Sequence, residues 1–308
     1  MVASKTVVIY FDAKVGSGFF DYAEYQDSYD EISRRARTRG CRVAMVFGPQ
    51  SYIGNMVFEN VYEFTEDARI VPVRGEVVAD VVFRKGSNFQ HITDAYVINP
   101  RDIERICGDK WTTHELFSQY MTPMWKISAA TASDVFAHAR TETVLLKPRT
   151  AWGGEGIIVT MKKDFRADML KDSVEYVCEE FVETKEGIAG IVNGRHDLRV
   201  YIYNGEPKFA VIRQPKGDGV LANLAQGGSL FEVKVGDLPQ WALDMVPVVE
   251  KELAQYGPRM YTIDMMFGNG RPYLVELNDK PAVPWRTWSY FDPMIDTILD
   301  TLLAGTKS

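Results

Sequence analysis

The sequence has few cysteines and no long apolar run. Its three cysteines, Cys41, Cys107 and Cys178, are odd in number and far apart, which fits neither a disulfide framework nor a zinc site. We expect buried thiols instead. The longest apolar runs, such as residues 6–11, are far below the roughly 20 residues that a membrane span needs. The first apolar segment is also too short for a signal peptide, so we expect a cytoplasmic protein.

The sequence also lacks an excess of basic charge. Among its 308 residues, Lys and Arg number 35 and Asp and Glu number 42, so the formal net charge is −7. This balance argues against partners such as nucleic acid or an anionic membrane, but it permits a local basic pocket for phosphate. With 46% hydrophobic and 25% charged residues, the composition is that of a globular protein and excludes a disordered chain. The length predicts about two domains.

Strand and helix patterns alternate in the first third of the chain. Apolar runs at 6–10, 41–47, 79–83 and 95–98 predict strands, and a helix is expected from Asp21 to about Arg39. A strand, a helix and a second strand in succession predict a parallel α/β sheet. A short helix after Asn99-Pro100 ends at Gly108. We therefore expect an N-terminal α/β domain over residues 1–108.

The remaining chain has an α+β pattern with antiparallel hairpins. Short strands and helices alternate over residues 111–147, and Asn204-Gly205 lies between two apolar runs, which is a strong hairpin signal. Gly268-Asn269-Gly270 does the same for a second hairpin. A helix over about 239–255 separates the two hairpins, and another is expected over about 293–303.

The second hairpin carries candidate metal ligands. Asp264 lies on its first strand, and Glu276 and Asn278 lie near the end of the other. Hard oxygen ligands suit Mg²⁺, which commonly takes one or two carboxylates plus phosphate oxygens. A two-residue loop puts Glu276 on the face opposite Asp264, whereas a three-residue loop puts all three side chains on one face. We expect the odd-length loop, with Gly270 at positive φ. Strand carboxylates that simply face water are the alternative.

A glycine-rich segment follows the apolar strand that ends at Lys147. It reads Lys-Pro-Arg-Thr-Ala-Trp-Gly-Gly-Glu-Gly-Ile over residues 147–157. Glycines allow backbone N–H groups close to phosphate oxygens, and a Lys adds positive charge. The Walker pattern is absent, and an ordinary turn is the alternative. The earlier Gly16-Ser17-Gly18 is a weaker candidate, since it lacks the third glycine of the dinucleotide fingerprint.

Two arginines lie near the first hairpin. Arg199 follows Asp197 and Leu198, and Arg213 ends the partner strand. If the Asn204-Gly205 loop has two residues, Arg199 pairs with Ala210, and the two arginines then need not share a face. Guanidinium groups suit carboxylate and phosphate recognition, although arginines at strand ends are most often solvated.

Taken in order along the chain, these elements resemble the ATP-grasp superfamily. The resemblance covers about residues 95–290 and is to the branch of glutathione synthetases and of ligases that add glutamate to ribosomal protein or small amines. It implies an α/β N-terminal domain of the pre-ATP-grasp type, followed by an α+β ATP-grasp region with antiparallel sheets over 109–308. That region would divide into a lid subdomain over about 109–185 and a catalytic subdomain over about 186–308.

The resemblance also implies roles for individual residues. Phosphate and glycine-loop contacts fall to Lys110, Lys147, Trp152, Gly153, Gly154 and Gly156. The hinge that holds adenine matches Glu180, Phe181 and Val182, and either Glu183 or Glu186 binds ribose. Residues toward the transferred phosphate are Arg199, Arg213 and Asn223. The metal ligands match Asp264, Glu276 and Asn278.

Some positions depart from the family's pattern. Leu221 and Gln214 stand where relatives often have Arg, and Ala282 stands where many have Gly. The first two face the acceptor side in relatives, so they bear on the substrate and not on the ATP site. Trp285 and Trp288 belong either to a core or to the substrate wall.

The function implied by the resemblance is that of an ATP-dependent carboxylate–amine ligase. An acyl phosphate forms first, an amine attacks it, and an amide, ADP and phosphate result. The expected cofactors are ATP as co-substrate and Mg²⁺, two ions in the usual arrangement, with Mn²⁺ as a substitute. The expected partners are a small carboxylate and an amine, such as an amino acid or short peptide, and a homo-oligomer is left open. The alternatives are a ligase for a D-amino acid or peptide and a non-catalytic ATP-binding regulator.

Overall fold

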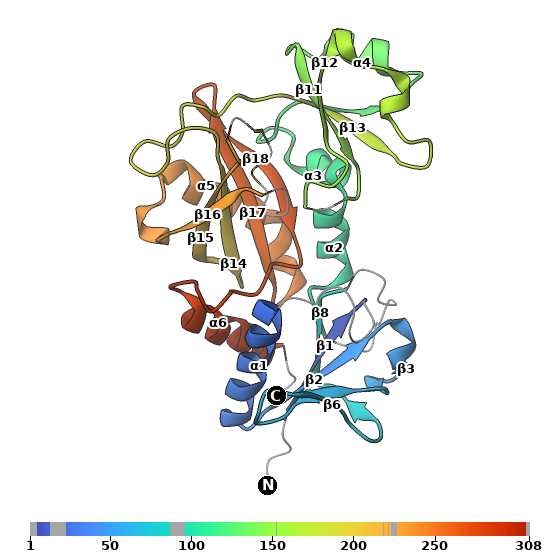
Figure 1. Ribbon diagram of the computed structural model, residues 1–308, viewed down its shortest axis with the longest axis vertical. Helices are drawn as coiled ribbons and strands as arrows, with labels where there is room; N and C mark the ends of the chain where they lie inside the picture. The colour runs from blue at the N-terminus through green and yellow to red at the C-terminus, as the bar shows by residue number, and fades with distance from the viewer. Residues whose placement is uncertain are drawn as a thin grey trace.

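The computed structural model describes residues 5–12, 23–86, 96–151, 153–217, 219–220, 222 and 227–305. In these ranges the chain forms four β-sheets with helices packed against them (Figure 1). None of the helices described there combines the length and the apolar character that a membrane crossing requires. All three cysteines are buried thiols outside any disulfide, which confirms the expectation.

The N-terminal sheet has the strand order β6-β5-β2-β1-β8-β9. Its strands are β1 (Thr6–Phe11), β2 (Arg42–Phe47), β5 (Tyr62–Phe64), β6 (Ile70–Pro72), β8 (Val81–Arg84) and β9 (Val97–Ile98). The pairs β1–β2, β1–β8 and β8–β9 are parallel. The predicted parallel sheet is therefore confirmed, and the antiparallel β5 and β6 extend one edge.

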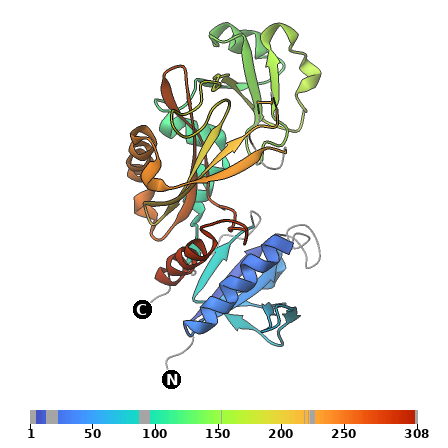
Figure 2. The same cartoon turned by 60° about the vertical axis from the view of Figure 1, so that its left-hand side comes forward.

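Two layers cover this sheet. Helices α1 (Ala23–Thr38) and α6 (Phe291–Ala304) lie side by side on one face (Figures 1 and 2). Apolar residues of the other face pack against a three-stranded sheet that the sequence patterns did not predict. Its strands are β3 (Tyr52–Gly54), β4 (Val57–Phe58) and β7 (Val77–Val78).

Helices α2 (Arg101–Gly108) and α3 (Lys110–Phe117) lead from the N-terminal sheet to a four-stranded antiparallel sheet. That sheet is at the top right of Figure 1 and has the order β10-β13-β11-β12. Its elements are β10 (Met124–Ile127), α4 (Ala132–His138), β11 (Thr143–Pro148), β12 (Ile158–Met161) and β13 (Tyr176–Glu180). Short 3-10 helices follow β12 at Lys162–Asp164 and Ala167–Met169.

A five-stranded antiparallel sheet forms the centre of the molecule (Figure 1). In spatial order its strands are β16 (Ser229–Val233), β15 (Glu206–Gln214), β14 (Asp197–Tyr203), β17 (Met260–Gly268) and β18 (Arg271–Asn278). Helix α5 (Gln240–Leu253) packs on one face with the residues that alternate along the strands, including Leu198, Val200 and Ile263. The intervening residues point to the opposite face, which carries the polar side chains described below.

The hairpin β17–β18 has a two-residue loop, so the odd-length loop we expected is wrong. Gly268 pairs with Arg271, and Asn269 and Gly270 both have positive φ, of 51° and 73°. A β-bulge between Asp264 and Met265 puts Asp264 and Glu276 on the same face instead. It leaves Val275 without a partner in the strand pairing and so pairs Asp264 with Glu276. The positive φ of Gly270 and the shared face of the three candidate ligands are thus both confirmed.

A second bulge corrects the expected register of the hairpin β14–β15. Its loop is Asn204-Gly205, but the register shifts between Tyr201 and Ile202. Arg199 consequently pairs with Val211 rather than Ala210, and Arg213 pairs with Asp197. Since residues two apart on a strand share a face, both arginines point to the same side of the central sheet.

Ion pairs hold α6 to α1, although the two helices are far apart in the sequence. Arg35 contacts Asp292 and Asp296, and Arg39 contacts Asp296 and Asp300. The apolar face of α6, with Ile295 and Leu299, is fully buried against the N-terminal sheet. The C-terminal helix therefore packs with the first sheet, although we had assigned it to the second region by sequence. The boundary near residue 108 stays a prediction.

Buried polar contacts fasten the N-terminal sheet to the central one. Arg84 at the end of β8 is 4% exposed and pairs with Asp279, after β18, and with Glu104 of α2. Asn99 exchanges hydrogen bonds with the backbone of Met260, at 2.6 and 2.9 Å. These contacts fix where β18 ends relative to β8 and α2.

We predict that the Arg35–Glu31 contact stabilises the fold in a pH-dependent way. Burial alone would raise the pKa of Glu31, but hydrogen bonds from Arg34 and Arg35 lower the pKa from 4.5 to about 2. Arg35→Ala should lower the free energy of unfolding by about 2 kcal/mol at neutral pH. Because a lowered carboxyl pKa stabilises above its unfolded value, the loss should shrink as pH falls from 4.5 toward 2.

The measurement is urea unfolding of wild type and variant at neutral pH and at about pH 3. Arg34→Ala is the matched control, since Arg34 contacts the same carboxylate but its side chain is 55% exposed. The control should lose less stability. An equal loss in both variants, or a loss that grows in acid, contradicts the prediction.

Candidate functional site

The polar face of the central sheet is organised around the carboxylate of Asp264. This residue is fully buried on β17. Arg199 grips it with two hydrogen bonds, of 2.7 and 2.6 Å, and Arg213 adds a third of 2.7 Å. Burial alone would raise the pKa of Asp264, but the two guanidinium groups reverse that effect and lower the pKa. Asp264 is therefore an anion at any ordinary pH.

A second carboxylate completes the network. Asp197 accepts hydrogen bonds of 2.6 and 3.1 Å at Oδ1, and one of 2.7 Å at Oδ2, all from Arg213. Burial raises the pKa of Asp197, and Arg213 only partly offsets the effect of burial and of the neighbouring Asp264. Arg213 thus lies between two carboxylates from two different strands.

The three candidate metal ligands lie together on this face. The Asn278 amide is 3.5 Å from Asp264 Oδ2 and 3.3 Å from Glu276 Oε1. Within the part of the chain that the structure describes, no group of three His, Cys, Asp or Glu side chains could hold a metal ion. Two carboxylates and one amide nevertheless fit Mg²⁺, because it fills its remaining positions with phosphate oxygens and water.

Two lysines approach this face from α3 and from the four-stranded sheet. Lys110 begins α3, and its Nζ donates to the carbonyl of Ala151 at the start of the glycine loop. Burial lowers the pKa of Lys110. Asp109 caps the same helix at 3.0 Å from the Trp111 N–H and pairs with Arg149 at 2.6 Å. This pair ties the start of α3 to the end of β11, where the second lysine lies.

Lys147 on β11 is held by a buried partner. Its Nζ contacts Glu179 on the neighbouring strand β13, with side-chain exposures of 10% and 2%. Thr122 donates a further hydrogen bond to Glu179. Because both ends of this ion pair are buried, the Lys147 side chain has one well-defined position.

The glycine loop turns at all three of its glycines. Gly153, Gly154 and Gly156 have φ of 64°, 78° and 71°, values that favour glycine. At Gly156 a Cβ would also come within 2.8 Å of Pro148. Trp152, expected in the same loop, lies outside the described residues, as do Asn223, Leu221 and Gly16 to Gly18.

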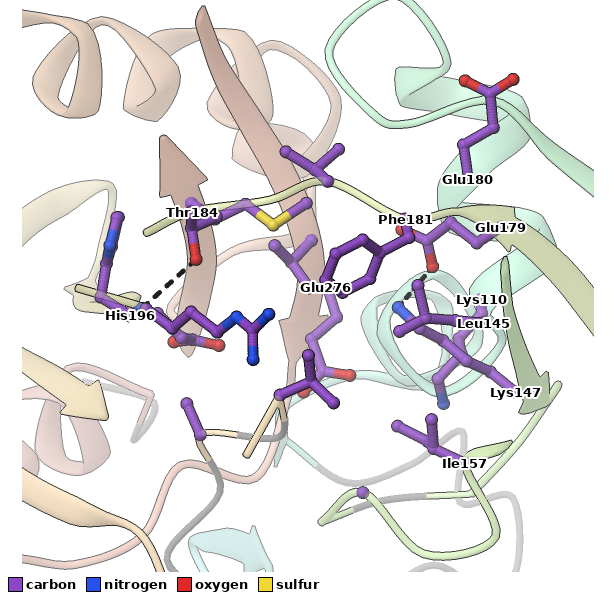
Figure 3. Close-up of a pocket in the computed structure, with 18 of the residues that line it drawn as sticks. Lys110, Leu145, Lys147, Ile157, Glu179, Glu180, Phe181, Thr184, His196 and Glu276 are labelled. Carbon is purple, nitrogen blue, oxygen red and sulfur yellow. Dashed lines mark hydrogen bonds and ion pairs between the residues drawn. The ribbon is translucent and has the colours of Figure 1, made fainter. Parts of the chain in front are cut away.

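The hinge after β13 runs along the same cavity. Phe181 and Val182 line it, while the Glu180 side chain points away from it, as Figure 3 shows, and accepts a hydrogen bond from the Arg140 N–H at 2.6 Å. Only the backbone of Glu180 thus remains on the cavity side. The turn of the β17–β18 hairpin abuts this hinge, because a Cβ on Gly268 would lie 2.5 Å from the Glu183 carbonyl oxygen.

The structure distinguishes the two glutamates after the hinge. Arg195 grips Glu183 with two hydrogen bonds of 2.8 Å, and Arg195 itself lines the cavity. The pKa of Glu183 is lowered to about 2, chiefly by the hydrogen bond from Arg195. Glu186 is exposed. Sequence reasoning did not select Arg195, which lies just before β14 and has no motif signal of its own.

These elements enclose a cavity between the four-stranded sheet and the central sheet (Figure 3). Lys110, Lys147 and Ile157 lie on one side of it and Thr184 and His196 on the other, with Phe181 and Glu276 between them. His196 accepts from the Phe267 N–H at 3.3 Å and contacts the Gly194 carbonyl at 3.1 Å. Burial lowers the pKa of His196.

A second cavity adjoins the first at Glu276, which lines both. Arg199, Arg213 and Asn278 form its polar end. The remaining lining is mainly aromatic or apolar and consists of Tyr25, Gly153, Tyr201, Val211, Leu230, Ala282, Trp285 and Trp288. Tyr25 was not a sequence candidate, because nothing in its helical pattern separates it from an ordinary core residue.

We predict that Asp264 matters more for folding than Glu276. Asp264→Asn removes the bidentate anion of Arg199 and leaves Arg213 paired with Asp197 alone, so it should lower the free energy of unfolding by about 3–5 kcal/mol. Glu276 is 27% exposed, and the nearest Arg199 nitrogen is 3.9 Å away, so Glu276→Gln should cost less than about 1 kcal/mol. Urea unfolding of both variants tests this, and equal losses would refute it.

Comparisons with known proteins agree with this geometry. The family model described as "Prokaryotic glutathione synthetase, ATP-grasp domain" matches residues 110–279, more than half of the chain. A search of curated protein sequences gave no match. Among solved structures, D-alanyl-alanine synthetase A from Vibrio cholerae has a TM-score of 0.67 at 13% identity, covering 99% of this chain and 98% of its own.

Two further structures are similar over their whole length. D-cycloserine synthetase DcsG has a TM-score of 0.65 at 12% identity and covers 96% of this chain and 99% of its own. The ATP-grasp ligase PsnB, complexed with minimal precursor, has a TM-score of 0.61 at 15% identity and covers 98% and 99%. At these low identities, the structural similarity shows the fold alone. The family match shows more: the chain belongs to the family of the prokaryotic glutathione synthetase ATP-grasp domain and is an ATP-grasp ligase.

Proposed function

We propose that the protein joins a carboxylic acid to an amine through an acyl phosphate, with release of ADP and phosphate. The observation that carries this proposal is the meeting of two cavities at Glu276. One cavity has two lysines and Gly154 of the glycine loop, which suit a nucleoside triphosphate, and the other has arginines suited to a carboxylate. A phosphoryl group at their junction is within reach of both.

In this proposal ATP occupies the first cavity. Adenine lies along the backbone of residues 180–182, and the β- and γ-phosphates lie near Lys110, Lys147 and the N–H groups of Gly153, Gly154 and Gly156. Two ion pairs support this assignment, because Glu179 holds the ammonium group of Lys147 and the Asp109–Arg149 pair holds the start of α3, where Lys110 lies. Trp152 stays part of the proposed loop.

Asp264, Glu276 and Asn278 are the proposed ligands of Mg²⁺. The metal would neutralise charge on the β- and γ-phosphates and orient them for in-line transfer. Asp264 is already shared with two arginines, so Glu276 and Asn278, which are less buried, offer the more accessible oxygens. Mn²⁺ fits the same oxygen donors.

The chemical steps follow from the charges. A carboxylate oxygen attacks the γ-phosphorus, and the bond from phosphorus to the β,γ-bridging oxygen breaks to release ADP. The amine nitrogen then attacks the acyl carbon, phosphate leaves with the former carboxylate oxygen, and the nitrogen loses a proton. Arg199 and Arg213 offset the charge of the transferred group. Asn223 is proposed beside them from the resemblance.

The proposed substrates are an amino acid or short peptide on the acid or amine side. D-alanyl-alanine synthetase A is named for a dipeptide product, and PsnB was solved with a minimal precursor, so D-amino acids or peptides are the alternatives. A regulator that binds ATP without turnover is the remaining alternative, and turnover distinguishes it.

We predict that Glu276→Gln abolishes turnover while ATP still binds. The variant keeps the lysines and the hinge but removes the charge at the junction of the two cavities. The assay is ADP release with Mg·ATP against a panel of acids and amines, with products read by mass spectrometry as acid plus amine minus water. Unchanged turnover in the variant counts against the metal assignment, and ATP binding without turnover in wild type favours the regulator.

We predict that ribose is bound by Glu183 and not by Glu186. Glu183 is held by Arg195, which lines the cavity, whereas Glu186 is exposed. Glu183→Ala should raise the KM for ATP about tenfold, consistent with the loss of a hydrogen bond to a charged group. Glu186→Ala is the matched control and should leave the KM unchanged. The opposite pattern would assign ribose to Glu186.

A further inference from the structure

The second cavity changes from polar to aromatic over a short distance. Arg213 on β15 pairs directly with Leu230 on β16, and Arg199 on β14 pairs with Val211. Directly opposed residues of antiparallel strands share a face. The charged end and the apolar end of the cavity are therefore neighbours on one sheet face.

The guanidinium groups keep donors for a further anion. Arg199 uses Nε and Nη2 on Asp264, and Arg213 uses Nε and Nη2 on its two carboxylates. In the described ranges no hydrogen bond involves Nη1 of either residue, and neither nitrogen is among the buried atoms that have no partner. Since both residues line the cavity, these donors are available to a carboxylate there.

Aromatic side chains from separate elements form the opposite end. The ring of Trp285 meets Tyr25 of α1 edge to face, with centroids 6.4 Å apart. It lies 6.0 Å from Trp288 at an angle of 40°. Tyr201 lines the floor from β14. Aromatic rings prefer edge-to-face and tilted arrangements of this kind, so an aromatic group in the cavity would interact favourably with these rings.

The segment that carries the tryptophans is fastened on both sides. Ser28 of α1 donates to the Pro284 carbonyl at 2.5 Å, and Arg286 lies 3.5 Å from Glu31. On the other side, the Ser289 N–H donates to Glu232 of β16 at 2.7 Å. The aromatic wall is therefore in place before any ligand binds, which lowers the entropy cost of binding.

We propose that the acid substrate of this enzyme carries an aromatic group, held by Tyr25, Trp285 and Trp288, with its carboxylate at Arg199 and Arg213. This inference rests on the proposed function and adds the substrate class to it. The short side chain of Ala282, which also lines the cavity, leaves the space that the aromatic group takes.

The test compares two acids that differ only in the ring. Binding of 3-phenylpropanoate and of propanoate is measured by calorimetry, with and without Mg²⁺ and a non-hydrolysable ATP analogue. We expect 3-phenylpropanoate to bind at least about tenfold more tightly, because burial of a ring removes a large apolar area from water. Trp285→Ala should remove most of this preference and leave the affinity for the ATP analogue unchanged.

Two further variants separate binding from folding. Trp241→Ala is the matched control, since the Trp241 ring packs against Phe267 at an angle of 31° and lines neither cavity. It should keep the preference for the ring. Ala282→Leu fills the aromatic end without removing a core side chain, and it should weaken 3-phenylpropanoate by about tenfold and spare propanoate.

The outcomes distinguish this inference from the function on which it rests. Equal affinity for the two acids, no binding of either, or an unchanged preference in both Trp285→Ala and Ala282→Leu overturns the aromatic substrate class. If the ATP analogue still binds in that case, the ATP site stands. If the analogue does not bind to wild type, the proposed function itself fails, whatever the acids do.

Discussion

The site depends on one buried interaction, the guanidinium of Arg213 between the carboxylates of Asp197 and Asp264. Arg199 adds a second cation to Asp264, so two positive and two negative charges lie at the centre of the sheet. A buried charge is tolerated only when it is paired and hydrogen-bonded. Three adjacent strands must therefore keep their register, since a slip of one residue would move a partner to the face that packs on α5. The ion-pair network therefore favours this strand register, and the register in turn aligns the members of the network.

This constraint explains the division of the central sheet into two faces. The face toward α5 is apolar and continuous, with Leu274 and Leu277 both buried there despite their odd spacing. The bulge at Val275 makes this possible, because it reverses the alternation of side chains between the two leucines. Without this change, one strand could not supply both the core leucines and the polar pair Glu276 and Asn278. The extra residue Val275 thus allows β18 to contribute both to the core and to the polar site.

The chemistry of the site could be predicted from the sequence more fully than its geometry. The order of Lys147, the glycines, Arg199, Arg213 and the Asp264 hairpin was sufficient to indicate the superfamily, because charge type and spacing are local properties. The two bulges were not predictable in this way. A bulge arises where pairing with another strand conflicts with side-chain alternation, and the sequence of one hairpin does not contain that partner. We inferred the correct face for Asp264 and Glu276 but attributed it to the loop, and we left the two arginines unplaced.

Helix α6 has a consequence for how the chain folds. It completes the core of the first sheet, and its contacts with α1 join residues as many as 261 positions apart. The strands of the N-terminal sheet therefore keep a partly uncovered apolar face while the four-stranded and central sheets are synthesised. Closure of so long a loop delays the contacts that stabilise the first sheet. The N-terminal sheet is thus synthesised early but completed late. Until α6 packs on it, its uncovered apolar face is exposed to aggregation.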